Sequence, residues 1–189
     1  EKGIDTLLEA WARVMKHIPD ARLQLFGSGP QQNAVSHEIA ERGLHQSATL
    51  RPAIDAAGVR EHMRAATVLV LPSRTEAFPM VLLEAAAMEL PAIASNVGGV
   101  AEIIDDGATG SLVDADDSES LALALIQHLS ISPIEQAEIG AAAQEKAQAH
   151  FRARMMAESY QRVYGSEGQS LHNASQSENS GRLQISRQT

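Results

Sequence analysis

Two glutamates separated by seven residues, Glu76 and Glu84, are the side chains whose type and spacing most clearly suggest chemistry. Glu76 falls in a stretch with loop composition, Pro72 to Pro79, whereas Glu84 falls among strong helix formers that predict a helix over 80–88. No cation lies three or four residues from Glu84, so it has no local ion-pair partner. An ionised carboxylate only accepts hydrogen bonds, and the hydroxyls of a vicinal diol are donors that suit it.

The start of that predicted helix is a second chemical feature. Pro79 suits the first helical position, where its missing N–H is not needed. The unpaired N–H groups and the partial positive charge of a helix start form an anion site. Phosphate at the helix start and hydroxyls at the carboxylates together indicate a nucleotide-sugar site. The alternative is that Glu84 is a solvated helix residue and Glu76 a capping acid, and the residue types leave both open.

The same segment resembles the E-x7-E signature of the retaining glycosyltransferases of family 4. Further matches follow in the family's order, and they are Lys2-Gly3, Gly27-Ser-Gly-Pro30, Gly98-Gly99 with Glu102, and Asp106-Gly-Ala-Thr-Gly110. The resemblance covers about residues 1 to 164. It implies the C-terminal, donor-binding half of a two-domain enzyme of the GT-B type.

The resemblance also implies roles for particular residues. Glu84 would hold the ribose hydroxyls, Glu76 would contact the donor sugar near the reaction centre as the catalytic candidate, and Lys2 would contact the donor phosphates. The other substrate-binding residues that it implies act through their backbone, and they are Ala53 and Ile54 at the nucleotide base and Ala77, Phe78, Met80 and Val81 at the sugar and phosphates.

The implied activity is transfer of a sugar from a UDP-, GDP- or ADP-linked donor to an acceptor, with retention at the anomeric carbon. No metal or other cofactor is expected, because the helix start and Lys2 would stabilise the leaving diphosphate. In this family the leaving phosphate accepts the acceptor's proton on the front face, and no side-chain nucleophile is assigned. The acceptor sugar, lipid or glycan would bind through an N-terminal domain, so we expect this chain to bind the donor and to turn over weakly or not at all.

Two departures from the family's pattern keep other functions open. Pro52 stands where glycine is usual and has no N–H, while Ala77 replaces a glycine and is strained there only if its φ is positive. Both favour a degenerate, non-catalytic binding domain. A nucleotide-sugar epimerase or a phosphorylase relative would share the fold and is the other alternative.

An alternation of strands and helices must position these residues. Apolar runs and alternating patterns predict strands over 22–26, 48–50, 68–71, 91–95 and 110–113. Helical spacing and stop signals predict helices over 5–17, 31–42, 59–66, 80–88, 100–104, 117–129, 133–150 and 153–164. This order predicts an α/β fold, a Rossmann-like parallel sheet with helices on both faces, and a site beyond the carboxyl ends of the strands. Because the chain starts directly with a helical pattern, we expect the fold to be truncated at its N-terminus.

The composition of the chain limits the kinds of partner and compartment that we expect. The 189 residues are 44% hydrophobic and carry a net charge of −9, which argues against nucleic acid as a partner. There is no cysteine, which fits a reducing compartment, and no apolar run long enough for a transmembrane segment. We therefore expect a cytoplasmic protein, at the inner face of the membrane if it is part of a longer one. Residues 1–164 are the predicted domain, and the polar stretch 165–189 is predicted to be a disordered tail.

Overall fold

The computed structural model describes residues 1–151, in which strands and helices alternate as the sequence predicts. The strands are β1 (Leu23–Phe26), β2 (Ala48–Arg51), β3 (Leu69–Leu71), β4 (Ala92–Ser95) and β5 (Gly110–Val113). The helices are α1 (Ile4–Val14), α2 (Gln32–Glu41), α3 (Ala56–Ala65), α4 (Met80–Ala87), α5 (Val100–Ile103), α6 (Ser118–Ser130) and α7 (Pro133–His150). Residues 1–148 form one compact unit. The predicted helix over 153–164, the boundary at 164 and the predicted tail lie outside the described residues.

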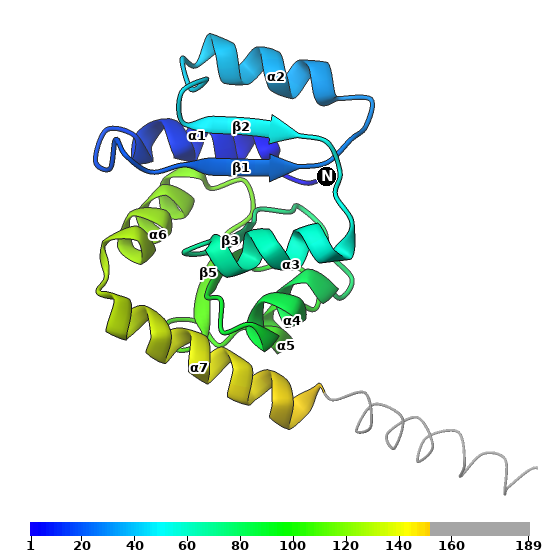
Figure 1. The fold of residues 1–189 in the computed structure, drawn as a ribbon, viewed down its shortest axis with the longest axis vertical. Coiled ribbons are helices and arrows are strands. Elements are labelled where there is room, and N and C mark those ends of the chain that lie inside the picture. The colour runs from blue at the N-terminus through cyan, green and yellow to red at the C-terminus, as the bar shows by residue number, and fades with distance from the viewer. Residues whose placement is uncertain (152–189) are drawn as a thin grey trace, which may run out of the picture. The chain divides into compact units, whose positions relative to one another are not determined.

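Every strand pair is parallel, but the strands form two groups instead of one continuous sheet. β1 pairs with β2, and β4 lies between β3 and β5, so the two groups are distinct in Figure 1. The expected single sheet is therefore divided between β1 and β3 in the described part of the chain. Periodicity identifies a strand from its own residues, whereas its neighbour in the sheet is set by long-range packing, which the sequence pattern does not specify.

One hydrophobic core nevertheless joins the two groups. α1 and α6 pack over the same face of the strands, where Trp11 of α1 and Ile93 of β4 belong to one buried cluster. The helical spacing of the apolar residues in α1 produces this packing, because it places them on a single side of the helix. The indole Nε1 of Trp11 also donates a hydrogen bond of 3.1 Å to the buried Ser47 Oγ, which ties α1 to the start of β2.

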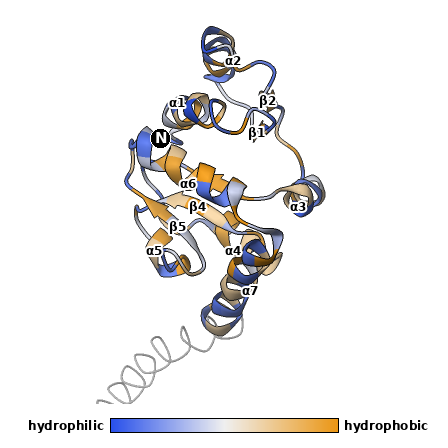
Figure 2. Ribbon diagram, turned by 90° about the vertical axis from the view of Figure 1, so that its left-hand side faces the viewer, coloured by the Kyte–Doolittle hydropathy of each residue, from blue (hydrophilic) through white to orange (hydrophobic). Residues whose placement is uncertain are grey.

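Helices cover the opposite face as well. Met63 of α3, Ala85 of α4 and Leu90 form a second cluster, against which Leu69 of β3 packs. α3 begins three residues earlier than predicted, because Asp55 caps it by accepting a 2.8 Å hydrogen bond from the Gly58 amide. Figure 2 shows hydrophobic colour on β4 and on parts of α4 and α6, whereas α2, with Ile39 as its one buried residue, is largely hydrophilic.

α7 is held mainly by polar contacts and by one close backbone approach. Gln136 and Gln144 donate hydrogen bonds of 2.6 and 3.0 Å to the carbonyl oxygens of Thr67 and Ala87. Gly140 lies so close to Glu89 that a Cβ there would be 2.0 Å from the Glu89 carbonyl oxygen. The described part of the chain contains no helix with both the length and the apolarity needed to cross a membrane.

Candidate functional site

The loop between β3 and α4 fixes the Glu76 carboxylate with two donors. The Nζ atom of Lys2 and the Oγ atom of Ser73 each lie 2.7 Å from Oε1 of Glu76. Ser73 is buried, and the Glu76 side chain is only 13% exposed, whereas that of Lys2 is 63% exposed. The other carboxylate oxygen, Oε2, has no hydrogen-bond partner within residues 1–151. One oxygen of Glu76 is thus held in place, and the other is available to a ligand.

These contacts decide the charge of Glu76. Burial opposes ionisation of the carboxyl, but the hydrogen bonds from Lys2 and Ser73 and the charge of Lys2 outweigh it and lower the pKa of Glu76 below its ordinary value of 4.5. Glu76 is therefore an acceptor-only carboxylate at neutral pH.

The N-terminal segment is bound against this loop, and this is what brings Lys2 to Glu76. The Arg74 amide donates a 2.8 Å hydrogen bond to the carbonyl of Glu1. Gly3 has a φ of 59°, and a Cβ there would lie 1.9 Å from the Pro72 carbonyl oxygen, so both its conformation and its closeness require glycine. The Lys2-Gly3 pair noted in the sequence thus combines a cation with the residue that lets it approach the loop.

A pair of glycines supports the other side of the loop. A Cβ at Gly98, whose φ is 52°, would lie 1.6 Å from the Glu76 carbonyl oxygen. The Gly99 amide donates a 3.0 Å hydrogen bond to the carbonyl of Ala77. In the described chain only Glu89 and Asp116 are non-glycine residues with positive φ, so Ala77 carries no such strain. One of the two departures from the family's pattern is therefore structurally harmless.

The start of α4 follows this loop and has the features of an anion site. Pro79 is the N-cap residue, with φ −78° and ψ 100°, so its predicted place as the first helical residue was wrong by one position, and Met80 begins the helix. Among residues 1–151, no side chain caps this end. The amides of Met80 and Val81 have no hydrogen-bond partner in the described part of the chain, which leaves two donors and the positive end of the helix dipole unoccupied.

Glu84 lies one helical turn beyond Met80 and faces away from the core. Both residues are exposed, whereas the opposite side of α4 buries Leu82, Ala85 and Ala86. Glu84 takes part in no hydrogen bond or ion pair with the residues that the structure describes. It is a free carboxylate on the same side of α4 as Met80.

Ala53 and Ile54 belong to a different loop from Glu76. They follow β2, Ala53 exposed and Ile54 partly buried, and lead into α3. No hydrogen bond joins either residue to the Glu76 loop within the described chain. The structure thus joins Lys2 directly to Glu76 in the loop that leads to α4. The placement of Ala53 and Ile54 at the nucleotide base stays a prediction.

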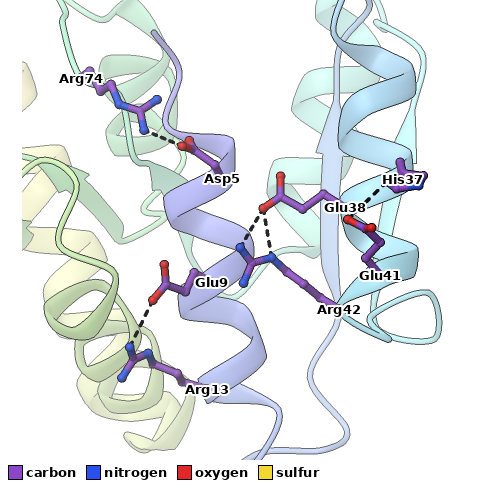
Figure 3. A network of polar contacts seen from close by, with 8 residues as sticks. All are labelled: Asp5, Glu9, Arg13, His37, Glu38, Glu41, Arg42 and Arg74. Atoms are coloured by element: carbon purple, nitrogen blue, oxygen red, sulfur yellow. Dashed lines mark hydrogen bonds and ion pairs between the residues drawn. The ribbon is translucent and has the colours of Figure 1, made fainter.

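Two residues of the loop were missed by sequence reasoning. Ser73 precedes Glu76 by three positions, a spacing at which a hydroxyl and a carboxylate can meet in a turn, so this contact had a local signal. Arg74 had none. Its Nη2 atom lies 2.7 Å from Oδ2 of Asp5, as Figure 3 shows, and its Nε atom lies 2.7 Å from Oδ1 of Asp116. These partners are 69 and 42 residues away.

The other polar groups were compared with the requirements of a metal site and with simple surface ion pairs. The described chain has no group of three or more His, Cys, Asp or Glu residues that could hold a metal ion. The remaining pairs in Figure 3 are four residues apart on α1 or α2 or at the end of α2, and they are at least partly exposed: Glu9 with Arg13, His37 with Glu41, and Glu38 with Arg42.

Comparisons with known proteins show what this chain is similar to in sequence and in fold. An exopolysaccharide phosphotransferase of Streptomyces coelicolor is 40% identical over 131 residues, which are 66% of this chain and 13% of that protein. A sucrose-phosphate synthase structure from Thermosynechococcus elongatus is 32% identical with a TM-score of 0.76, over 87% of this chain and 43% of that one. A protein from Anabaena, solved with UDP and glucose, has a TM-score of 0.77 at 22% identity, over 87% of this chain and 45% of that one.

The fold of these structures confirms the Rossmann-like half of a GT-B enzyme, and the chain spans less than half the length of each of the three proteins. The family model described as glycosyl transferases group 1 matches residues 1–146, which include Lys2, the Glu76 loop and α4. The chain therefore belongs to the glycosyl transferases group 1 family.

Proposed function

We propose that the Glu76 loop and the start of α4 bind a nucleotide-sugar donor, and that the protein transfers the sugar to an acceptor with retention. The observation that carries this proposal is the placement of the Lys2 ammonium, 2.7 Å from Glu76, beside the loop that leads to the unpaired amides of Met80 and Val81. A cation and two amide donors suit a diphosphate, and a carboxylate next to them suits a hydroxyl of the sugar. The structural relative solved with UDP and glucose supports a donor of this class.

Each site residue has a role in this proposal. Lys2 and the amides of Met80 and Val81 bind the diphosphate, and Glu84 accepts hydrogen bonds from the ribose hydroxyls. Glu76 binds the donor sugar at the reacting carbon with the help of its free oxygen. The backbone of Ala77 and Phe78 lines the sugar, and that of Ala53 and Ile54 holds the base.

The transfer needs no nucleophilic side chain in this proposal. The bond between the anomeric carbon and the phosphate oxygen breaks, and the acceptor oxygen bonds to that carbon from the same face. The leaving phosphate oxygen takes the proton of the acceptor hydroxyl. Negative charge develops on the diphosphate as it leaves, and Lys2 and the positive end of α4 stabilise it there, which is the charge a metal ion would otherwise balance. For this reason we propose a metal-independent reaction.

The acceptor belongs to a different part of the enzyme. Because the chain spans less than half of the related proteins, we propose that a further domain binds the acceptor, which is a sugar, lipid or glycan. The isolated chain then binds the donor and turns it over slowly or not at all. The absence of cysteine fits a cytoplasmic reaction, including one at the inner face of a membrane.

Titration calorimetry with UDP-glucose, GDP-mannose and ADP-glucose tests the proposal directly. We expect one of the three donors to bind, and Glu84→Ala to weaken its binding at least about tenfold because the ribose loses a charged acceptor. Glu145→Ala removes an exposed helical carboxylate from α7 and is the matched control, which keeps normal affinity. If the unaltered chain binds none of the donors, the proposed function is wrong. If Glu84→Ala binds as tightly as the control, the ribose role of Glu84 is wrong.

A further inference from the structure

Arg74 contacts two segments that are distant from it in the sequence, the N-terminal segment and the loop between β5 and α6. Its amide holds the carbonyl of Glu1 at 2.8 Å, its Nη2 holds Asp5 at 2.7 Å at the start of α1, and its Nε holds Asp116 at 2.7 Å in the loop between β5 and α6. Asp116 also accepts a 3.1 Å hydrogen bond from the Thr6 hydroxyl. The guanidinium is planar and presents its donors in a fixed fork, so one side chain fixes two carboxylates on different elements.

These contacts hold the residues that precede and follow Lys2 in the sequence. Glu1 before it and Asp5 after it are bound by the same arginine, and Gly3 rests on the carbonyl of Pro72, two residues before Arg74. The Lys2 side chain is 63% exposed, so its own packing does little to hold it near Glu76. The position of its backbone must come from the neighbours that are bound.

We propose that Arg74 is a positioning residue of the donor site, which sets the distance between the Lys2 ammonium and the Glu76 carboxylate by clamping the N-terminal segment to the loop after β3. Arg74 acts through Lys2 and contacts no substrate itself. The expected effect on binding rests on the proposed function: a displaced Lys2 weakens binding of the diphosphate. The clamp itself is a property of the free protein and can be tested without a ligand.

The number of charged partners distinguishes Arg74 from a simple surface ion pair, because its guanidinium binds two carboxylates. An isolated exposed pair contributes little, but here one cation faces two carboxylates and a backbone contact lies beside them. The hydrogen bond from Arg74 is the main cause that lowers the pKa of Asp5, against a smaller opposing effect of burial. Asp5 therefore stays ionised across the neutral range, and the clamp stays closed there.

Two variants and a matched control test the inference. Arg74→Gln removes the fork, and Arg74→Lys keeps the charge but cannot hold two carboxylates with the same geometry. Arg42→Gln removes the Arg42–Glu38 pair on α2 and is the control, because Arg42 is 34% exposed and Arg74 is 35% exposed. The readouts are the titration of the Glu76 carboxyl carbon by NMR and the dissociation constant of the donor identified by calorimetry.

We expect the Glu76 carboxyl to titrate at higher pH in Arg74→Gln than in the unaltered chain, because Lys2 is no longer held beside it. Donor binding should weaken by about fivefold, with Arg74→Lys intermediate and Arg42→Gln unchanged. If Arg74→Gln does not fold, Asp5→Asn loosens one arm of the fork and should shift the titration in the same direction by less. An unchanged Glu76 titration in the folded variants overturns the clamp.

The outcomes separate this inference from the proposed function. If the unaltered chain binds no donor while Arg74→Gln shifts the Glu76 titration, the clamp stands and the proposed function fails. If the donor binds and the titration of Glu76 stays the same in Arg74→Gln, the proposed function stands and the clamp fails.

Discussion

The ammonium of Lys2 lies 2.7 Å from Oε1 of Glu76, 74 residues away along the chain. This contact pairs a lysine ammonium with the carboxylate proposed for the sugar, in the loop that leads to α4. A diphosphate that approaches the helix start therefore competes with Glu76 for Lys2. The pair keeps Glu76 ionised and holds Lys2 near the place where negative charge would develop.

Replacing Lys2 should affect charge and binding together. In Lys2→Met the pKa of Glu76 should rise toward or above its ordinary value of 4.5, because burial then acts against a single remaining donor, Ser73. Affinity for a nucleoside diphosphate should fall about tenfold through loss of a charge-assisted contact. Carboxyl NMR and calorimetry measure the two effects. Lys16→Met, which removes an exposed lysine after α1, should change neither, and equal behaviour of the two variants would argue against the Lys2 role.

The glycine that supports the loop should tolerate no side chain. A Cβ at Gly98 would lie 1.6 Å from the carbonyl oxygen of Glu76, and its φ of 52° disfavours alanine as well. Gly98→Ala should destabilise the protein by about 3 kcal/mol in urea unfolding. Gly107→Ala, at φ 74° with open space around it, isolates the conformational cost of about 1 kcal/mol, and Gly29→Ala should stay within about 0.5 kcal/mol. If Gly98→Ala and Gly107→Ala lower the free energy of unfolding equally, the contact between a Cβ at position 98 and Glu76 adds no destabilisation.

The parts of the fold that depend on local sequence were predictable. The helix over 133–150 and the strand over 110–113 begin and end where their stop signals and apolar patterns place them. The strand, loop and helix order around Glu76 followed from an apolar run, two prolines and a series of helix formers. These signals act between residues that are close in the sequence, so hydrophobic periodicity is enough to predict the elements.

Long-range contacts were predictable only in part. The resemblance placed Lys2 and Glu76 at the same donor, but their direct contact depends on the conformation of Gly3 and on the bond between Glu1 and Arg74. Nothing near Arg74 in the sequence indicates its partners, because both acids come from other elements. The division between β1 and β3 likewise depends on which strands meet in space.

α7 offers a test in which helix propensity and packing predict opposite signs. Alanine favours a helix interior over glycine by about 1 kcal/mol, so propensity alone predicts that Gly140→Ala stabilises the protein. A Cβ there would lie 2.0 Å from the backbone oxygen of Glu89, a residue with φ 56°. We expect packing to dominate, with a lower urea midpoint and faster hydrogen exchange in α7. A raised midpoint would mean that α7 can move away from Glu89 without cost.

His128 should make the protein sensitive to mild acid. Its side chain is buried, its Nε2 lies 2.9 Å from Ser111 Oγ, and its Nδ1 has no hydrogen-bond partner in the described chain. Burial lowers the pKa of His128 below its ordinary value of 6.5, because the charged form is poorly solvated there. At a pH between the pKa of His128 in the folded state and its ordinary value of 6.5, this histidine is protonated in the unfolded chain and neutral in the folded chain. Stability is therefore complete above about pH 6.5 and decreases as the pH falls toward the pKa of the folded state.

Urea midpoints at about pH 7.5 and about pH 5.5 measure this dependence. We expect the unaltered chain to lose stability at the lower pH, and His128→Gln to lose much less because glutamine does not titrate. His45→Gln removes an exposed histidine and should keep the full dependence, so the comparison isolates the buried site. The two variants are compared by the change in urea midpoint between the two pH values, because His128→Gln also alters packing at both. If both variants show the same difference, a group other than His128 causes the acid sensitivity.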